Sequence, residues 1–287
     1  MADGVAFGLF GIHRGEMAEP VALGRRARLA EAAGFESVWV GDHISLPTGS
    51  QAVAAYPPEQ PRLEALTTLS YLAGITSRVK LGVGVIVMPQ RHPLLLAKQL
   101  STVDVLSGGR LIFGIGVGYV PLELEALGAS MSDRGARTDE HLAAVRAAWD
   151  ERAPDFAGTY VSWTDLMQRP LPIQRPGPPV VVGGSSKAAY RRAILKANGF
   201  YGHNLTLEAT ARVLGEIREL AGGLDRPAEL GPLEITIAPR ESLDLDLARR
   251  YADLGVDRIL LLPHDLDSPT AVEDEVTRLG ETVVGRL

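Results

Sequence analysis

The 287-residue sequence contains no cysteine. This absence excludes disulfides, thiolate nucleophiles and metal sites with sulfur ligands. Aromatic residues make up only 6% of the chain, and no lysine- and arginine-rich run with interleaved aromatic residues occurs. Together with a formal net charge of -6, these features argue against a nucleic-acid-binding surface.

The sequence also lacks any apolar run that approaches the roughly 20 residues of a membrane-spanning helix. Its beginning, MADGVAFGLF, has no positively charged segment before an apolar stretch of signal-peptide length. We therefore expect a cytoplasmic protein without a membrane partner. The apolar content of 46% is sufficient for a large core in a chain of this length.

One unit recurs along the chain, an apolar strand followed by an amphipathic helix. The pattern predicts eight strands, at residues 5–10, 37–40, 79–87, 111–115, 180–182, 199–202, 233–238 and 258–262. Eight such units indicate an α/β fold of the (β/α)8 TIM-barrel type, because a doubly wound sheet usually needs only five or six strands. We expect a single domain over residues 1–287, with an insertion at about 120–178 after the fourth strand.

Residues 79–119 show this unit most clearly. Pro93 stands where a first helical residue is expected, and Gly108 stands where that helix should end. Gly114, Gly116 and Gly118 then alternate along the fourth strand and beyond it. Such glycines leave room for a flat or phosphorylated group, but tight packing between strands explains the same spacing, and both interpretations stay open.

In a TIM barrel, reactive groups lie at the carboxyl ends of the strands. Five of the six histidines directly follow predicted strands: His13, His43, His92, His203 and His264. Five imidazoles on one rim favour a site that needs hydrogen-bond donors and near-neutral acids. A metal-dependent hydrolase is a weaker alternative, because the first strand has no His-x-His and the fourth ends in glycines without a carboxylate.

Two clusters at the predicted rim carry the clearest chemical signals. Asp42 and His43 directly follow the apolar strand SVWV, where a charged residue is costly unless it has a function. Gly183, Gly184 and Ser185 lie between the fifth strand and a helix, where free backbone N–H groups can bind a phosphate. The structural alternatives are that Asp42 caps the loop that follows it and that Ser185 caps the helix.

Several motifs together resemble the luciferase-like monooxygenase superfamily over nearly the whole chain. They are VWVGDH, LGVGVIVMPQRHPLLLAKQLSTVDVLSGGRLIFGIGVGY, RGARTDEHLAAVRAAW and PPVVVGGSSKAAYRRA, in this order. The resemblance implies a TIM barrel with an insertion after the fourth strand, a flavin-type cofactor at the carboxyl rim and a homodimer. The compact chain, the GIGVGY turn and the Asp-His pair are more similar to the branch that uses the deazaflavin coenzyme F420 than to the FMN branches.

By this resemblance, Asp42 and His43 face the deazaflavin ring and the substrate. The Gly84–Val85 peptide, which is cis in many members of that branch, supports the far side of the ring. The resemblance also implies that the cofactor is bordered by Gly116, Val117, Gly118 and Tyr119. Its phosphate is bound by Gly183, Gly184 and Ser185. Tyr119 stands where the sugar-phosphate dehydrogenases of the family carry a glutamate, which argues against glucose-6-phosphate as the substrate.

The resulting hypothesis is F420-dependent hydride transfer to or from a small organic substrate. His43 is the expected proton donor or acceptor, and Tyr119 is a second candidate. An FMN-dependent monooxygenase is the alternative within the family, and a non-catalytic flavin-binding barrel is the alternative from another class. The loops at 45–61 and 154–179 are expected to determine the substrate.

Overall fold

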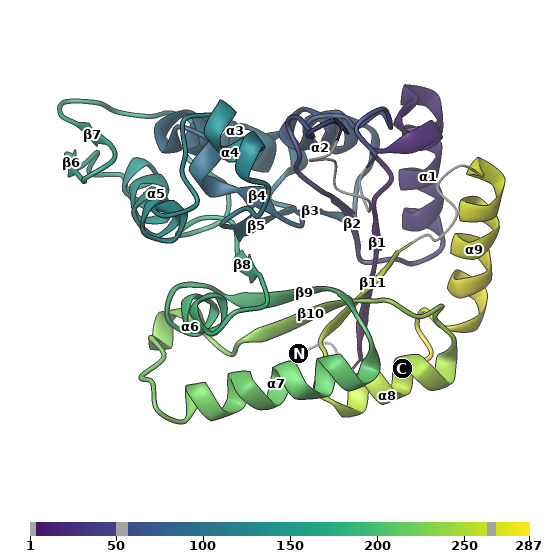
Figure 1. Ribbon diagram of the computed structural model, residues 1–287. Coiled ribbons are helices and arrows are strands. Elements are labelled where there is room, and N and C mark those ends of the chain that lie inside the picture. The colour runs from purple at the N-terminus through teal and green to yellow at the C-terminus, as the bar shows by residue number, and fades with distance from the viewer. Residues whose placement is uncertain (1–3, 50–56, 263–267) are drawn as a thin grey trace.

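The computed structural model describes residues 4–49, 57–262 and 268–287. Within these ranges one closed sheet of parallel strands forms the centre of the molecule (Figure 1). Its strands are β1 (Ala6–Phe10), β2 (Ser37–Val40), β3 (Lys80–Val83), β4 (Ile86–Val87), β5 (Leu111–Gly116), β8 (Val180–Gly183), β9 (Gly199–Leu205), β10 (Glu234–Pro239) and β11 (Arg258–Leu261). Pairing of β3 with β5 closes the ring, and the predicted TIM barrel is confirmed.

The strand predicted at residues 79–87 is not continuous. The structure divides it into β3 and β4, which follow one another along the same edge of β5. The division falls at Gly84 and Val85, whose peptide bond is cis, as the family resemblance implied. Counted as one interrupted strand, β3 and β4 make this a barrel of eight strands.

Helices surround the barrel (Figure 1). They are α1 (Pro20–Ala32), α2 (Ala65–Ile75), α3 (Pro93–Ser107), α6 (Lys187–Lys196), α7 (Leu207–Ala221), α8 (Leu245–Asp253) and α9 (Pro269–Thr282). The predicted signals set the bounds of α3: Pro93 occupies its first turn, and Gly108 ends it with a left-handed φ of 69°. No helix within the described ranges is both long enough and apolar enough to cross a membrane.

The excursion predicted at about 120–178 lies between β5 and β8. It contains α4 (Pro121–Ala126), α5 (Arg134–Ala148) and a two-stranded hairpin of β6 (Phe156–Ala157) and β7 (Ser162–Trp163). Helix α5 packs against α3, and the hairpin lies beyond α5 at the outer edge of the molecule (Figure 1). Helix α4 returns toward the loop after β2, because Glu123 contacts residues 43–45.

Large side chains fill the interior of the barrel. They come from β1, β2, β5, β8, β9, β10 and β11 and comprise Phe10, Trp39, Ile112, Val181, Tyr201, Ala238 and Leu260. Trp39 is fully buried and stacks on Tyr201, with ring centroids 5.9 Å apart. Gly82 makes room for it, since a Cβ at that position would lie 2.2 Å from the indole. The barrel is therefore a packed core and not a channel.

Charged residues close the end of the barrel at which the strands begin. Arg258 is 3% exposed, and its guanidinium donates hydrogen bonds to Glu36, Glu234 and Thr236. The Nζ of Lys80 lies 2.7 Å from a Glu36 carboxylate oxygen. Burial alone would raise the pKa of Glu36, but Arg258 and Lys80 lower that pKa from 4.5 to about 2. This end of the barrel is a network of paired charges.

Candidate active site

A cavity of 530 Å³ opens at the carboxyl ends of the strands. Its volume lies in the range of about 300–1,000 Å³ that is typical of small-molecule and cofactor sites. The eleven residues predicted for the site all line this cavity: Asp42, His43, Gly84, Val85, Gly116, Val117, Gly118, Tyr119, Gly183, Gly184 and Ser185. The structure thus brings together residues that the sequence distributes over four strand ends.

The side chain of Val85 forms an apolar part of the cavity wall. A Cβ at Gly116 would lie 2.5 Å from one methyl group of Val85, and a Cβ at Gly183 would lie 2.8 Å from the other. Beyond β5, a Cβ at Gly118 would likewise lie 2.7 Å from Val87. These glycines therefore serve tight packing between strands, and they hold Val85 between two neighbouring strand ends.

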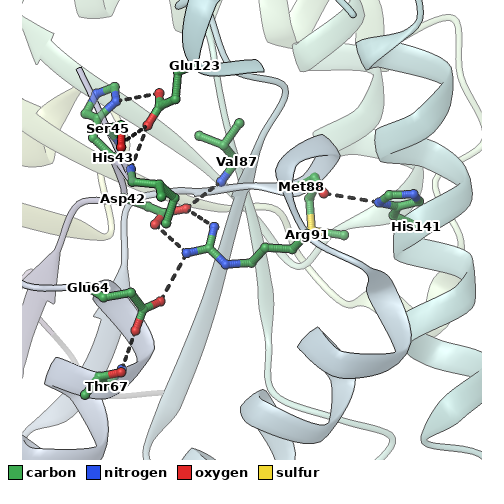
Figure 2. A network of polar contacts seen from close by, with 11 residues as sticks. Asp42, His43, Ser45, Glu64, Thr67, Val87, Met88, Arg91, Glu123 and His141 are labelled. Atoms are coloured by element: carbon green, nitrogen blue, oxygen red, sulfur yellow. Dashed lines mark hydrogen bonds and ion pairs between the residues drawn. The ribbon is translucent and has the colours of Figure 1, made fainter. Parts of the chain in front are cut away.

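His43 lies between a carboxylate and a phenol. Its Nδ1 is 3.0 Å from Oε2 of Glu123 (Figure 2), and its Nε2 is 3.3 Å from the hydroxyl of Tyr119. The imidazole side chain is 14% exposed, whereas Tyr119 is 52% exposed. An imidazole held in this way at a cavity wall can transfer a proton to or from a bound molecule.

Glu123 is not among the residues predicted from the sequence. It lies in the first turn of α4, is 4% exposed, and accepts hydrogen bonds from the backbone N–H groups of Ile44 (2.6 Å) and Ser45 (3.2 Å). Burial alone would raise the pKa of Glu123, but the hydrogen bonds from His43 and from the backbone lower it below its usual value. One signal was available: a glutamate two residues after Pro121, just beyond the glycine-rich strand end.

Asp42 lines the cavity but is bound by the protein itself (Figure 2). Arg91 contacts both of its carboxylate oxygens, at 2.5 and 2.7 Å, and the N–H of Val87 donates to one of them at 3.0 Å. Burial raises the pKa of Asp42, and these two partners oppose that rise. Asp42 therefore joins two loops through Val87 and Arg91, and does not serve as the cap of its own loop that the structural alternative proposed. Its contact with a cofactor stays a prediction.

Arg91 was also missed by the sequence-based prediction. It follows the apolar residues of β4 by a few positions, so the argument that singled out Asp42 applies equally to this arginine. Arg91 additionally donates to Glu64 at 3.1 Å, which extends the network to the N-terminus of α2 (Figure 2). The loops after β2 and β4 are thereby fixed relative to each other.

His13 is buried beside the cavity, with 3% exposure. Its Nε2 accepts a hydrogen bond from the N–H of Gly41 at 3.2 Å. Burial, together with the nearby charges of Arg14 and Arg62, lowers the pKa of His13 to about 3. His13 is therefore neutral at physiological pH and positions the start of the loop that carries Asp42 and His43.

The remaining histidines do not all share the rim. His203 lines the cavity, and its Nδ1 lies 2.7 Å from the hydroxyl of Tyr201. His92 instead borders a second cavity of 430 Å³, between α3, α5 and residues 163–169. The expectation that His92 shares the common site is therefore wrong, because His92 lies at the start of α3, beside the second cavity and not at the mouth of the barrel. His264 lies outside the described residues. Among the residues that the structure describes, no group of three or more His, Asp or Glu side chains could hold a metal.

The predicted phosphate-binding residues surround the N-terminus of α6. Ser186, and not Ser185 as the structural alternative proposed, caps the helix by accepting the N–H of Ala189 at 3.2 Å. Ser185 is exposed and lines the cavity. Gly184 has a φ of 140°, a conformation that favours glycine. The hydroxyl of Ser185 and the first N–H groups of α6 are thus available to an anion.

Two arginines line the cavity on the same side. Arg134 donates to the carbonyl oxygen of Gly118 at 2.8 Å, which fixes the turn after β5. Arg192 pairs with Asp139 through contacts of 3.0 and 3.1 Å. Both guanidiniums have hydrogen-bond donors beyond those used in these contacts. This side of the cavity fits an anionic group better than a cationic one.

Comparisons with known proteins agree with the fold and show the family. The luciferase-like monooxygenase family matches residues 6–243. An uncharacterized protein of Mycobacterium tuberculosis, Rv0940c, is 28% identical over 243 residues, which are 82% of each chain. The FMNH2-dependent dimethylsulfone monooxygenase of Pseudomonas putida is 27% identical over 215 residues, which cover 74% of this chain and 56% of that protein.

A solved structure gives the same architecture. The F420-dependent secondary alcohol dehydrogenase in complex with an F420–acetone adduct has a TM-score of 0.78, covers 97% of this chain and 98% of its own, and is 15% identical. That likeness shows the shared fold. Because the family match extends over most of the sequence, the chain belongs to the luciferase-like monooxygenase family.

Proposed function

We propose that this protein is an F420-dependent oxidoreductase that transfers hydride to or from a small organic substrate. One observation carries the proposal: the apolar wall made by Val85, held between Gly116 and Gly183, lies in the same cavity as His43 with its partner Glu123. A flat redox ring requires an apolar surface on one side and a proton-transfer group near the substrate on the other.

The residues of the cavity fit such a cofactor. Val85 would lie behind the ring, and residues 116–119 would border it. The N-terminus of α6 and Ser185 would bind the phosphate. Arg134 and Arg192 supply further donors on that side, which suits F420 because this cofactor carries carboxylates in addition to its phosphate.

When bound, F420 supplies a ring carbon that gives or accepts hydride and does not readily activate oxygen. The protein then has three tasks. His43 takes up or releases the substrate proton at Nε2. Tyr119 donates a hydrogen bond to that nitrogen or to a substrate oxygen, since its hydroxyl is 3.3 Å from Nε2. Phe10 and Val85 present apolar surface that limits the access of water.

Titration of the purified protein with F420 and with FMN, followed by fluorescence, tests the cofactor. We expect micromolar affinity for F420 and no binding of FMN. The similarity to the dimethylsulfone monooxygenase favours the rival, an FMN-dependent monooxygenase, and tight binding of FMN alone would establish it. Failure to bind either cofactor would contradict both proposals.

Replacement of His43 tests its chemical role. His43→Ala should lower turnover by about 10²- to 10⁴-fold, which is the usual contribution of a proton-transfer residue. Its affinity for F420 should stay unchanged. Turnover is measured with oxidised F420 and a panel of small alcohols, and with reduced F420 and small ketones. His92→Ala is the matched control, because His92 borders the other cavity and should have no effect.

A further inference from the structure

Three glutamates in this structure hold loops in the same way. Each accepts hydrogen bonds from successive backbone N–H groups of a distant loop: Glu31 from residues 77–79, Glu123 from residues 44 and 45, and Glu140 from residues 159–161. Of the three, Glu123 is the one that also contacts an imidazole, and it is the most deeply buried, with 4% exposure. This difference indicates a role beyond fixing a loop.

The contacts of Glu123 determine which nitrogen of His43 carries the proton. The backbone N–H groups of Ile44 and Ser45 can only donate, so Oε1 accepts both of them. The lowered pKa of Glu123 means that it is ionised at neutral pH, and an ionised carboxylate can only accept hydrogen bonds. The 3.0 Å contact between Oε2 and His43 therefore requires a proton on Nδ1. In a neutral imidazole, Nε2 is then unprotonated.

We propose that Glu123 is a positioning residue that holds His43 in the Nδ1–H tautomer and directs Nε2 toward the substrate. This inference rests on the proposed role of His43 in proton transfer. It gives the inserted helix α4 a part in the reaction, because that helix supplies the carboxylate. The hydroxyl of Tyr119, 3.3 Å from Nε2, faces the nitrogen that carries no proton in this tautomer.

The surroundings of the ring agree with this role. The Tyr119 hydroxyl lies on the Nε2 side, and the nearby His13 stays neutral. The adjacent Asp42 is bound to Arg91. Glu123 is therefore the carboxylate that contacts the imidazole and fixes its tautomer.

The tautomer can be measured without cofactor or substrate. Two-bond ¹H–¹⁵N correlation spectra of the labelled full-length protein distinguish the two imidazole nitrogens, and the signals of His43 are those lost in His43→Ala. We expect protonated Nδ1 and unprotonated Nε2 in the unaltered protein and in Glu140→Gln. Glu123→Gln should yield a mixture of tautomers. Protonated Nε2 in the unaltered protein would overturn the inference, whatever the variants do.

Kinetics separate positioning from loop support. Glu123→Gln should lower turnover by about 10- to 100-fold, as is typical for the loss of a supporting hydrogen-bond partner, with unchanged F420 affinity. Glu140→Gln is the matched control, since it also frees a loop but lies away from the cavity, and it should change neither value.

The two proposals can fail independently. If His43→Ala is inactive while Glu123→Gln retains the turnover and the tautomer of the unaltered protein, then the role of Glu123 is refuted and the proposed function stands. If His43→Ala turns over like the unaltered protein, then the proposed function loses its proton-transfer residue. A Glu140→Gln variant as impaired as Glu123→Gln would show that loop support alone explains both.

Discussion

The two ends of the barrel use buried charges for different purposes. At the end where the strands begin, Arg258 is bound by Glu36 and Glu234, and the adjoining cavity measures only 90 Å³. At the opposite end, the pairs Asp42–Arg91 and His43–Glu123 border a cavity of 530 Å³. Paired charges therefore close one end of the barrel. At the other end they fix the residues that surround an open cavity.

The two ends differ in whether the paired groups still have an atom that can contact a ligand. The carboxylates around Arg258 are engaged by that arginine and by Lys80. At the open end, Glu123 fixes one nitrogen of His43 and leaves the other at the cavity wall. We therefore expect mutations at the closed end to change stability and mutations at the open end to change chemistry.

The largest effect should come from Arg258→Ala. This change leaves Glu36 and Glu234 without their main partner. Because these carboxylates are themselves 25% and 41% exposed, the free energy of unfolding should fall by about 3 kcal/mol, the lower end of the range for breaking a buried ion pair. Urea unfolding measures the loss. Turnover per folded molecule should be unchanged. Arg25→Ala is the control, since its ion pair with Glu273 is 59% exposed on the arginine side and should contribute about 0–1 kcal/mol. Equal losses in both variants would contradict the comparison.

A pH series should reproduce part of this effect without mutation. The folded protein lowers the pKa of Glu36 from 4.5 to about 2, so the unfolded chain binds the proton first as the pH falls. Stability should therefore decrease between about pH 5 and pH 2, by about 2 kcal/mol from this group. Urea unfolding at several pH values tests this, and Glu36→Gln should make the dependence less steep. A Glu36→Gln protein with an unchanged pH dependence would show that other groups are responsible.

At the open end, Gly116→Ala should displace the side chain of Val85 from its position in the cavity wall. The new Cβ would lie 2.5 Å from a Val85 methyl group, and overpacking of this kind costs about 1–3 kcal/mol. F420 affinity should fall because Val85 must move. Adding Val85→Ala should restore much of the stability, since it removes the clashing methyl group. No recovery in the double variant would mean that the contact does not govern this site.

The smallest effects should separate two adjacent serines. Ser186→Ala removes the cap of α6 and should lower the free energy of unfolding by about 1 kcal/mol. Ser185→Ala should leave stability unchanged and weaken F420 binding. Thermal unfolding and fluorescence titration of both variants measure the two effects. The reverse assignment of stability and binding would contradict the division between capping and phosphate binding.

The barrel fold and the residues that line the site could be predicted because both follow from short stretches of the sequence. Strand and helix periodicity fixes the order of the units, and residues that follow strands must meet at one rim. This reasoning placed His43 and Ser185 in the cavity, whereas the family resemblance placed Val85 and Tyr119 there. It could not choose between capping serines, because Ser185 and Ser186 are adjacent and equally suited to the role.

The partners within the site could not be predicted. Glu123 and His43 are separated by 80 positions, and Arg91 and Asp42 by 49, and no periodic pattern links either pair. A prediction made strand by strand also does not say where a loop side chain points. For this reason His92 was wrongly placed at the common site. Pairing across a barrel mouth depends on loop geometry, which one sequence does not specify.

The most direct test is a crystal structure of the protein with F420 bound. We predict that the deazaflavin ring lies against Val85, with its phosphate at the N-terminus of α6 and Nε2 of His43 facing the space beside the ring. F420 bound instead in the second cavity, beside His92 and Trp163, would contradict this assignment of the active site.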